Sequence, residues 1–397
     1  MRVPDYLCRI LKSYFQNRVL VYDTEAGQRR MKVTAGVPQG SILGPTLWNA
    51  MYNGVLTLQL PTGVVLVGFA DDIVLSVIGE TLEEVEMLAA ESIGIIENWM
   101  DGVKLKIAHH KTEVLLVSNC KAVQRVEISV GEHVVASKRE LKHLGVMIDD
   151  RLNFNSHVDY ACEKAAKAIN ALSRIMPNTG GPRSSKRRLL ASVSSSILRY
   201  GVPAWGAALK TKRNRMKLNS AFRLMAMRVT SAYRTISSEA VCVIAGMIPI
   251  CITLEEDIEC YERRRTSQVR TLVRTASMTK WQQEWDSTEK GRWTHRLIPD
   301  VSTWVNRKHG EVNFHLTQFL SGHGCFRQYL HRFGHAASPF CPECENVEET
   351  PEHVVFICPR FEDVRRSMRH QAWTTSSTRC AALKSVECDQ QGSHKND

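Results

Sequence analysis

The sequence feature that most restricts the fold is a pair of acidic residues, Asp71 and Asp72, set between two short apolar runs. Residues 64–69 and 73–78 are rich in β-branched and aromatic side chains at strand length, so they predict a β-hairpin with at least one buried face. Two carboxylates side by side on a tight turn repel each other and lose solvent, and a bound divalent cation relieves that cost. The competing interpretation is an exposed Asp-Asp turn with no chemical role.

A loop rich in glycine and proline precedes this hairpin at residues 35–49, with the sequence AGVPQGSILGPTLWN. Such a loop can bring its backbone close to a ligand, and Ser41 can begin a helix. F-A-D-D follows about twenty residues later. Together the two segments resemble motifs B and C in the palm of non-LTR retrotransposon reverse transcriptases, in the family's order and spacing. The resemblance extends over roughly residues 4–361.

The resemblance implies a role for four of these residues. Asp71 would bind magnesium directly, Asp72 would support it, and Gln39 and Gly40 would lie along the template and the nucleotide. The implied reaction extends a DNA 3′ end on an RNA template during target-primed insertion. It uses two Mg²⁺ ions, one to lower the pKa of the attacking hydroxyl and one to stabilise the leaving pyrophosphate. The implied partners are the RNA template and the DNA primer or target.

The implied fold class is α+β: a partial right-hand polymerase palm with an acidic β-hairpin and helices, a helical thumb and a small C-terminal zinc knuckle. The expected parts are a palm with motifs B to E at 1–151, a thumb at 152–255, a helical connector at 256–315, a zinc-knuckle region that binds nucleic acid at 316–365 and a disordered tail at 366–397. Among non-LTR elements the chain is most similar to the type-1 elements that insert into ribosomal RNA genes of insects.

Residues before the loop predict a helix at 6–16 and two β runs at 19–22 and 30–34. In the family, motif A places another metal-binding aspartate on a separate strand before this point. Asp5 lies beside a proline and Asp23 lies in a turn, so neither has that context. We therefore expect a C-terminal fragment of a Pol polyprotein, whose N-terminal endonuclease, fingers and motif A are the partners of this chain.

After the hairpin, Thr81 and Glu84 have the spacing of a capping box before an amphipathic helix. Residues 102–118 then resemble the family's motif D and include a strand at 114–118. Lys111 is the candidate for a lysine near the leaving pyrophosphate, where an ammonium offsets negative charge or donates a proton. The alternative is a solvated lysine before a strand.

Residues 142–148, KHLGVMI, resemble the family's primer grip, a hairpin that positions the growing 3′ end. His143, Leu144 and Gly145 are the candidate residues. Their contribution would be placement, because in-line attack needs the reacting oxygen close to phosphorus. A plain edge hairpin is the alternative.

Two helices are expected at 156–176 and 183–200, and helical patterns continue at 221–229 and 239–248. The second helix begins with four cations, which oppose the helix macrodipole unless an anion compensates them. Arg183, Lys186, Arg187 and Arg188 are therefore candidate contacts to a nucleic-acid backbone, against the alternative of a solvated basic face. Residues 259–265 and 275–294 predict a long exposed helix and a connector.

The last informative stretch has the spacing Cys341-x2-Cys344-x8-His353-x4-Cys358. Three thiolates and one imidazole suit tetrahedral zinc, and a site filled by protein ligands predicts a structural metal. The stretch and its lead-in at 316–324 also resemble the C-terminal zinc knuckle of the same retrotransposons. That likeness implies nucleic-acid binding and a link to the function of an endonuclease elsewhere in the polyprotein.

Composition supports a polyanionic partner: the formal charge is +11 and the isoelectric point is near 9.1. Twelve scattered cysteines with one cluster favour a reducing compartment with one metal site. Neither a signal peptide nor a transmembrane segment is recognisable, so we expect an intracellular protein without membrane partners, nuclear during insertion.

Three functions from different classes remain open. The chain is the polymerase part of a longer polyprotein, or a catalytically incomplete remnant that only binds nucleic acid through the basic thumb and the zinc knuckle, or a host-derived scaffold that uses the zinc module for protein contacts. The missing motif A favours the remnant for the isolated chain. Primer extension in Mg²⁺ separates the first two functions.

Overall fold

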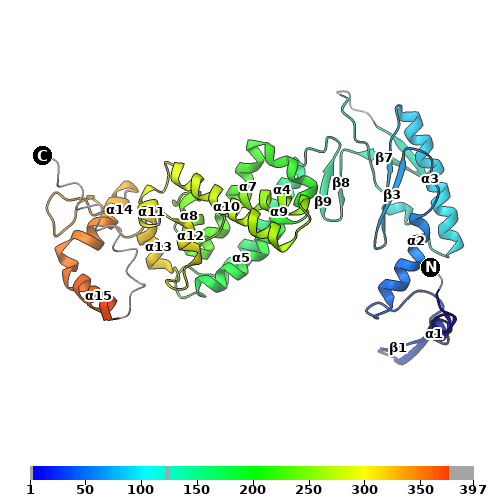
Figure 1. The fold of residues 1–397 in the computed structure, drawn as a ribbon, viewed down its shortest axis with the longest axis horizontal. Coiled ribbons are helices and arrows are strands. Elements are labelled where there is room, and N and C mark those ends of the chain that lie inside the picture. The colour runs from blue at the N-terminus through cyan, green and yellow to red at the C-terminus, as the bar shows by residue number, and fades with distance from the viewer. Residues whose placement is uncertain (1–2, 121–124, 375–397) are drawn as a thin grey trace. The chain divides into compact units, whose positions relative to one another are not determined.

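The computed structural model describes residues 3–120 and 125–374, which form two compact units (Figure 1). The N-terminal unit contains the described residues up to Leu116 together with those of Cys120–Lys138. The helical unit contains Val117–Asn119 and the described residues from Arg139 onward. Helices and strands are both present, which confirms the mixed fold class at that level. The finer division into palm, thumb, connector, knuckle and tail stays a prediction.

The N-terminal unit is built from three helices, a 3₁₀ turn and short strands. These are α1 (Asp5–Phe15), β1 (Val19–Thr24), β2 (Gly27–Lys32), α2 (Gly44–Leu56), β3 (Val64–Phe69), β4 (Asp72–Val77), α3 (Leu82–Gly102), η1 (His109–Lys111), β5 (Val114–Leu115), β6 (Glu127–Val130) and β7 (His133–Lys138). The pairs β1–β2, β3–β4 and β6–β7 are antiparallel, and β5 pairs in parallel with β7. The strand expected at 114–118 is therefore shorter than predicted.

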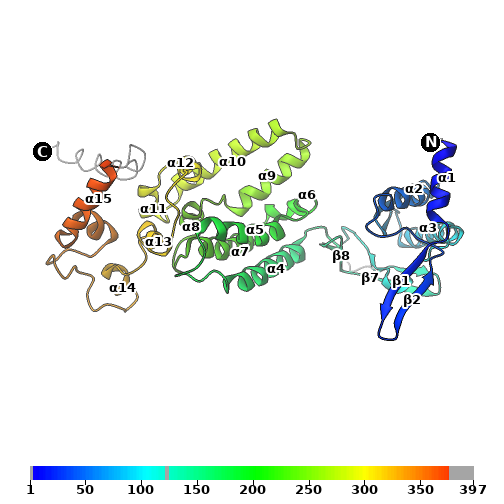
Figure 2. The ribbon, with the colours of Figure 1, turned by 90° about the horizontal axis from the view of Figure 1, so that it is seen from below.

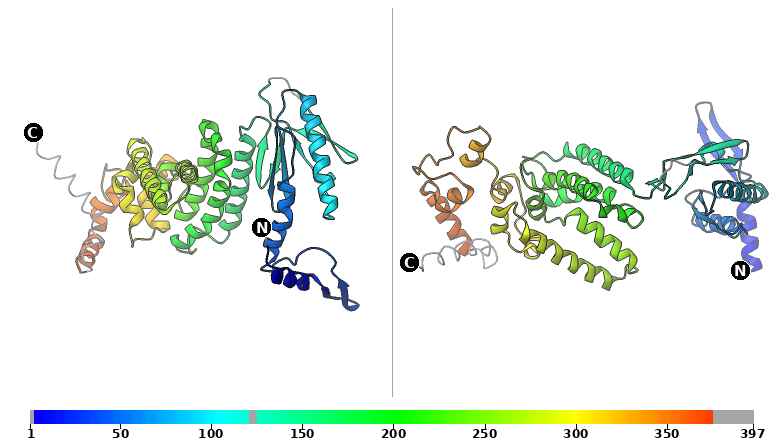
Figure 3. Two further views of the ribbon diagram at one scale, coloured as in Figure 1. Left: turned by 45° about the vertical axis from the view of Figure 1, so that its right-hand side comes forward. Right: turned by 90° about the horizontal axis from the view of Figure 1, so that it is seen from above.

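Helix α3 packs against the β3–β4 hairpin (Figure 3). It begins at the expected cap, because the Thr81 hydroxyl accepts from the Glu84 amide at 3.2 Å. The Glu84 carboxylate reaches back to the amide of Glu80 at 2.7 Å, one residue before the cap, instead of to the cap itself. Between α2 and α3, Tyr52 and Ile96 belong to a small apolar cluster behind the hairpin. This cluster fixes the face of β3–β4 that carries Leu66 and Leu75.

Helix α1 and the hairpin β1–β2 bury almost none of their apolar surface. Large side chains such as Tyr6, Ile10, Leu20 and Met31 are more than half exposed. A two-stranded hairpin without a packed face is only marginally stable in water. The hydrophobic effect therefore contributes little to the stability of α1 and β1–β2.

The helical unit begins with the hairpin β8 (Glu140–His143) and β9 (Val146–Asp149). Its helices are α4 (Asn155–Ser173), α5 (Ser184–Arg199), α6 (Val202–Trp205), α7 (Lys212–Thr230), α8 (Ser238–Ala245), α9 (Ile250–Glu262), α10 (Ser267–Ser287), α11 (Arg292–Leu297), α12 (Val301–Asn306), α13 (Phe314–Ser321), α14 (Arg327–Arg332) and α15 (Glu362–Thr374), with short 3₁₀ or π turns η2 (Gly206–Lys210), η3 (His353–Ile357) and η4 (Pro359–Phe361).

One continuous core joins most of these helices, and α4, α5 and α7 pack against one another. Helix α10 pairs with α9 (Figure 2) and buries Trp281 and Trp285, which are 2% and 1% exposed. Most residues of this long helix are exposed, as expected for the region, but Val273, Ser277, Trp281 and Trp285 form a buried face that was not expected. Two indoles four residues apart lie on one helix face, and that face is a core face.

In the part of the chain that the structure describes, no single helix has both the length and the apolar composition needed to cross a membrane. Only α8 and α9 taken together meet these criteria, and they are bent by 64° at the break between them. At the other end, α15 is helical to Thr374, so the expected disorder is wrong for residues 366–374. The rest of the expected tail, 375–397, lies outside the described residues.

Candidate functional site

The acidic pair lies at a tight hairpin turn. The register pairs Phe69 with Asp72, so Ala70 and Asp71 form a two-residue loop between β3 and β4. Both aspartates are exposed. Ala70 has φ +55°, a left-handed conformation that costs a residue with a Cβ about 1–2 kcal/mol. The surrounding structure must therefore hold this turn in place.

Two aromatic side chains of α2 hold the turn from behind. The Trp48 indole Nε1–H donates to the Ala70 carbonyl at 3.3 Å, and the Tyr52 hydroxyl donates to the Asp71 carbonyl at 3.4 Å. The two rings are stacked with centroids 5.2 Å apart. Burial, and then the nearby charges of Asp71 and Asp72, raise the pKa of Tyr52, so its hydroxyl stays protonated and able to donate. Both contacts fix the backbone and leave the carboxylates free.

The other candidates of the N-terminal unit are solvent-facing. Gln39 and Gly40 lie exposed in the loop before α2, and Gly40 has φ +83° with no atom within 4 Å of the position that a Cβ would take. Lys111 is the exposed last residue of η1, and Thr112 and Glu113 separate it from β5. These three residues belong to the same unit as Asp71 and Asp72, and their roles stay predictions.

The expected primer-grip residues belong to the helical unit. His143 ends β8, and Leu144 and Gly145 form the turn with φ of +45° and +84°. The Tyr200 hydroxyl donates to the Leu144 carbonyl at 2.8 Å. A Cβ on Gly145 would lie 3.1 Å from the same tyrosine ring, so glycine is required both for conformation and for space.

A buried histidine also supports this hairpin. His157 of α4 is 2% exposed, and its Nδ1 accepts from the Met147 amide of β9 at 3.2 Å. Burial lowers the pKa of His157 to about 4. The ring is therefore neutral near pH 7, as an accepting Nδ1 requires. The hairpin β8–β9 is thus fixed to the helices that follow it.

The four basic residues at the start of α5 that were expected to contact a nucleic-acid backbone do not form one surface. Arg183 and Lys186 are exposed, and Arg188 donates to the Ala245 carbonyl at 2.7 Å. Arg187 is only 4% exposed. Its guanidinium donates to the carbonyls of Pro182, Met176, Arg228 and Pro177.

Those four hydrogen bonds use all but one of the five N–H groups of a guanidinium. Arg187 is therefore unavailable to a phosphate, and its assignment as a nucleic-acid contact is wrong in this folded state. Its guanidinium instead satisfies carbonyl groups in the loop between α4 and α5 and in the last turn of α7, where carbonyls lack a partner within a helix.

The expected metal ligands of the C-terminal region come together. The ligand atoms of Cys341, Cys344, His353 and Cys358 all lie within 4.8 Å of one another. The sulfurs of Cys341 and Cys358 are 3.8 Å apart. Tetrahedral zinc with Zn–S bonds of about 2.3 Å places two thiolates about 3.8 Å apart.

The buried histidine of this cluster fits the same metal. His353 is 4% exposed, and neither of its ring nitrogens has a hydrogen-bond partner among the described residues. A buried imidazole without any partner is costly, and coordination removes that cost. The cluster therefore fits a structural zinc ion by donor type, spacing and burial.

The acidic turn offers less to a cation. Among the described residues, no third Asp, Glu, His or Cys side chain joins Asp71 and Asp72 in a group that could hold a metal. Two carboxylates suit Mg²⁺, which usually takes one or two carboxylates and completes its shell with water and phosphate oxygens. The donor set therefore fits magnesium together with a nucleotide.

Sequence reasoning missed the residues that support these sites. Trp48 and Tyr52 are four residues apart in the sequence, and that helical spacing was the available signal. His157 and Tyr200 contact the β8–β9 hairpin across the chain, and no local pattern marks them for that role.

Residues 1–148 match the family described as reverse transcriptase (RNA-dependent DNA polymerase). The matched part of the chain contains both the acidic turn and the loop that precedes it. No solved structure matches the chain well enough to support a comparison.

Most of the chain is similar to the Pol polyproteins of type-1 R1 retrotransposable elements. It is 28% identical over 374 residues to a retrovirus-related Pol polyprotein from element R1 of Bradysia coprophila, covering 89% of this chain and 37% of that protein. It is 29% identical over 361 residues to one from element R1 2 of Nasonia vitripennis, covering 83% of this chain and 86% of that protein. A shorter match, 22% over 222 residues, joins it to the RNA-directed DNA polymerase from mobile element jockey of Drosophila melanogaster, covering 54% of this chain and 24% of that protein.

Proposed function

We propose that this chain forms part of an RNA-directed DNA polymerase within the Pol polyprotein of a non-LTR retrotransposon. The observation that carries the proposal is the exposed acidic turn, strained at Ala70 and fixed by Trp48 and Tyr52. Strain of this kind persists only where the surroundings determine it, and it is concentrated at active sites and ligand clamps. The substrates are an RNA template, a DNA 3′ end and deoxynucleoside triphosphates.

In this proposal the chain positions the reactants. Asp71 and Asp72 hold the metal side of the triphosphate, because their carboxylates are exposed while their backbone is held by α2. Bound magnesium lowers the pKa of the attacking hydroxyl and offsets the charge of the leaving pyrophosphate. Gln39 and Gly40 lie along the template and nucleotide, and Lys111 offsets charge on the pyrophosphate or donates a proton to it.

The helical unit would hold the nucleic acid. The turn of Leu144 and Gly145, fixed by Tyr200 and His157, supports the primer 3′ end. Arg183, Lys186 and Arg188 contribute positive charge toward the duplex backbone, where each phosphate contact adds to a salt-dependent affinity.

The C-terminal cluster would hold zinc as a structural ion. With three thiolates and His353 as ligands, the site is closed to solvent chemistry and contributes to folding of the region around it. The fold of this region then serves nucleic-acid binding, and the whole polyprotein acts in the nucleus during insertion.

A second function is favoured by the same acidic turn. Only two metal-ligating side chains are grouped there in the part of the chain that the structure describes. The isolated chain would then bind nucleic acid through its basic helices and zinc region without catalysing synthesis.

Primer extension with Mg²⁺ tests the two functions. The polymerase proposal expects template-dependent incorporation that Asp71→Asn abolishes and Asp23→Asn leaves unchanged, since Asp23 lies on the exposed hairpin β1–β2. Binding of RNA without incorporation, equal in wild type and Asp71→Asn, selects the second function. Absence of salt-sensitive binding would refute both.

A further inference from the structure

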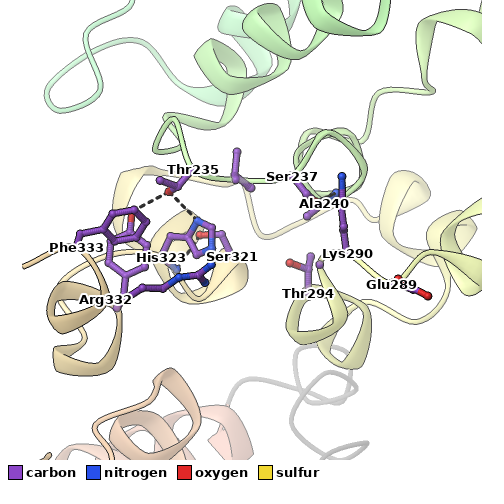
Figure 4. Close-up of a pocket in the computed structure, with 13 residues that line it drawn as sticks. Thr235, Ser237, Ala240, Glu289, Lys290, Thr294, Ser321, His323, Arg332 and Phe333 are labelled. Carbon is purple, nitrogen blue, oxygen red and sulfur yellow. Dashed lines mark hydrogen bonds between the residues drawn. The ribbon is translucent and has the colours of Figure 1, made fainter. Parts of the chain in front are cut away.

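The lead-in segment 316–324, which the proposed function does not use, forms one side of a pocket in the helical unit. The cavity has a volume of about 550 Å³. Its walls come from the segment before α8, the loop that leads into α11, the end of α13 and helix α14 (Figure 4). A volume in this range accommodates a ligand of nucleotide size.

One wall of the pocket is held rigid by hydrogen bonds between side chains. The Thr235 hydroxyl is 3.0 Å from Nδ1 of His323 and 2.7 Å from the hydroxyl of Tyr329 (Figure 4). The rings of His323 and Tyr329 are stacked, with centroids 4.9 Å apart and planes 25° apart. These side chains are therefore ordered before any ligand arrives, which lowers the entropy cost of binding.

Two cations line the pocket without an acidic partner. In the described part of the chain, neither Arg332 nor Lys290 forms an ion pair, and Arg332 lies close enough to His323 to help burial lower the pKa of that ring. Glu289 is the only carboxylate among the lining residues, so Arg332 and Lys290 give the lining a net positive charge. A positive, half-enclosed wall attracts a phosphate.

An aromatic face lies beside these cations. Phe333 is 44% exposed, its ring is 4.9 Å from that of Tyr329, and the guanidinium of Arg332 is 5.9 Å from its centroid. An exposed ring next to a cation is the arrangement on which nucleic-acid bases stack. The pocket thus offers both a phosphate contact and a base contact.

We propose that this pocket binds one nucleotide of a single-stranded nucleic acid. Arg332 contacts its phosphate, Lys290 at the other end of the pocket contacts the phosphate of an adjoining nucleotide, and the open face of Phe333 stacks on its base (Figure 4). The choice of a nucleotide over another phosphorylated ligand rests on the proposed function of the chain. RNA and DNA share the required chemistry.

The pocket is attached to the candidate zinc cluster through α14. The Gln328 amide donates to the Glu349 carbonyl at 3.3 Å, and its side chain donates to the Glu348 carboxylate at 2.6 Å. Arg327 forms an ion pair with Glu349 at 3.5 Å. Both glutamates lie in the segment between Cys344 and His353, so the cluster supports the helix that carries Arg332.

The test uses the full chain and a fluorescein-labelled single-stranded oligonucleotide, as RNA and as DNA of the same sequence. Binding is followed by fluorescence anisotropy at several salt concentrations. Arg332→Gln and Lys290→Gln should each weaken binding about five- to tenfold and make the slope of log K against log salt shallower by about 0.7, as expected for one phosphate contact to a single strand.

Two further variants separate stacking and non-specific charge. Phe333→Leu should weaken binding about 5- to 100-fold with the salt slope unchanged, because base stacking carries no charge. Arg366→Gln is the matched control, since Arg366 is an exposed arginine of α15 outside the pocket, and it should leave both quantities unchanged. Equal thermal unfolding midpoints show that the variants remain folded. A preference for RNA or for DNA identifies the strand that the pocket takes.

The inference is wrong if Arg332→Gln, Lys290→Gln and Phe333→Leu, all folded, bind within twofold of wild type. It fails independently of the polymerase proposal, because primer extension on the same proteins reports the latter. Loss of binding in the pocket variants of a chain that incorporates no nucleotide supports the pocket and refutes the polymerase. If the chain incorporates nucleotides and the pocket variants bind the oligonucleotide as tightly as wild type, the polymerase proposal is supported and the pocket proposal is refuted.

Discussion

Arg187 provides the sharpest test of the helical unit, because its sequence context and its structure predict opposite phenotypes. Arg187→Met keeps the apolar stem and removes a guanidinium that donates to four carbonyls. A buried carbonyl left without a partner costs about 1–3 kcal/mol. We take the lower end of that range, about 1 kcal/mol for each carbonyl, because a carbonyl can relax toward other donors. For four carbonyls the substitution should therefore lower the free energy of unfolding by about 4 kcal/mol.

The measurement is urea unfolding at pH 7, followed by the fluorescence of tryptophan. Three indoles of this unit, Trp205, Trp281 and Trp285, are at most 2% exposed, so their emission shifts strongly when its core opens. The unfolding midpoint of Arg187→Met should fall well below that of the wild type.

The neighbouring Lys186 supplies the matched control, because it is exposed on the same turn of α5. Lys186→Met should change the free energy of unfolding by less than about 0.5 kcal/mol and weaken RNA binding. The reasoning is refuted if Arg187→Met unfolds like the wild type and loses affinity for RNA, because Arg187 would then face a phosphate instead of carbonyls.

Three further predictions concern the site and its supports. Trp48→Phe keeps an aromatic ring and removes the donor to Ala70, so incorporation should fall by up to about 100-fold, the loss that a misplacement of about 1 Å causes, with less than about 1 kcal/mol lost in urea unfolding. His157 has a folded pKa of about 4 and an unfolded value near 6.5. Only the unfolded chain takes up this proton between those pH values, so stability is lost as pH falls from 6.5 to 4, by at most about 3 kcal/mol, and His157→Gln should remove this dependence in unfolding experiments at stepped pH. Cys358→Ser should reduce bound zinc, measured by elemental analysis, from one ion per chain toward none and lower the thermal unfolding midpoint; a zinc-free wild type of equal stability contradicts the proposed site.

The local patterns predicted what depends on local order. Two short apolar runs rich in β-branched and aromatic residues, one on each side of Asp71 and Asp72, predicted the hairpin, because strand preference and a short turn are local properties of the sequence. The spacing of Cys341, Cys344, His353 and Cys358 predicted a cluster, and the structure brings their ligand atoms together. A knuckle brings its ligands into reach within a short stretch, so sequence distance is close to spatial distance there.

Contacts between distant segments could not be predicted in this way. Arg187 resembles a surface cation in its own helix, yet one of the carbonyls it satisfies belongs to Arg228, forty-one residues later. The support of Leu144 by Tyr200 spans fifty-six residues. The left-handed φ of Ala70 likewise depends on α2 and not on the propensity of alanine, which disfavours it.

The uncovered apolar surface of α1 and β1–β2 has a practical consequence for anyone who purifies this chain. Open strand edges next to exposed Leu20 and Met31 are templates for pairing with other molecules. Concentrated samples should therefore self-associate through residues 3–34 before any other region, and detergent or a solubilising fusion at that end should keep the preparation monodisperse.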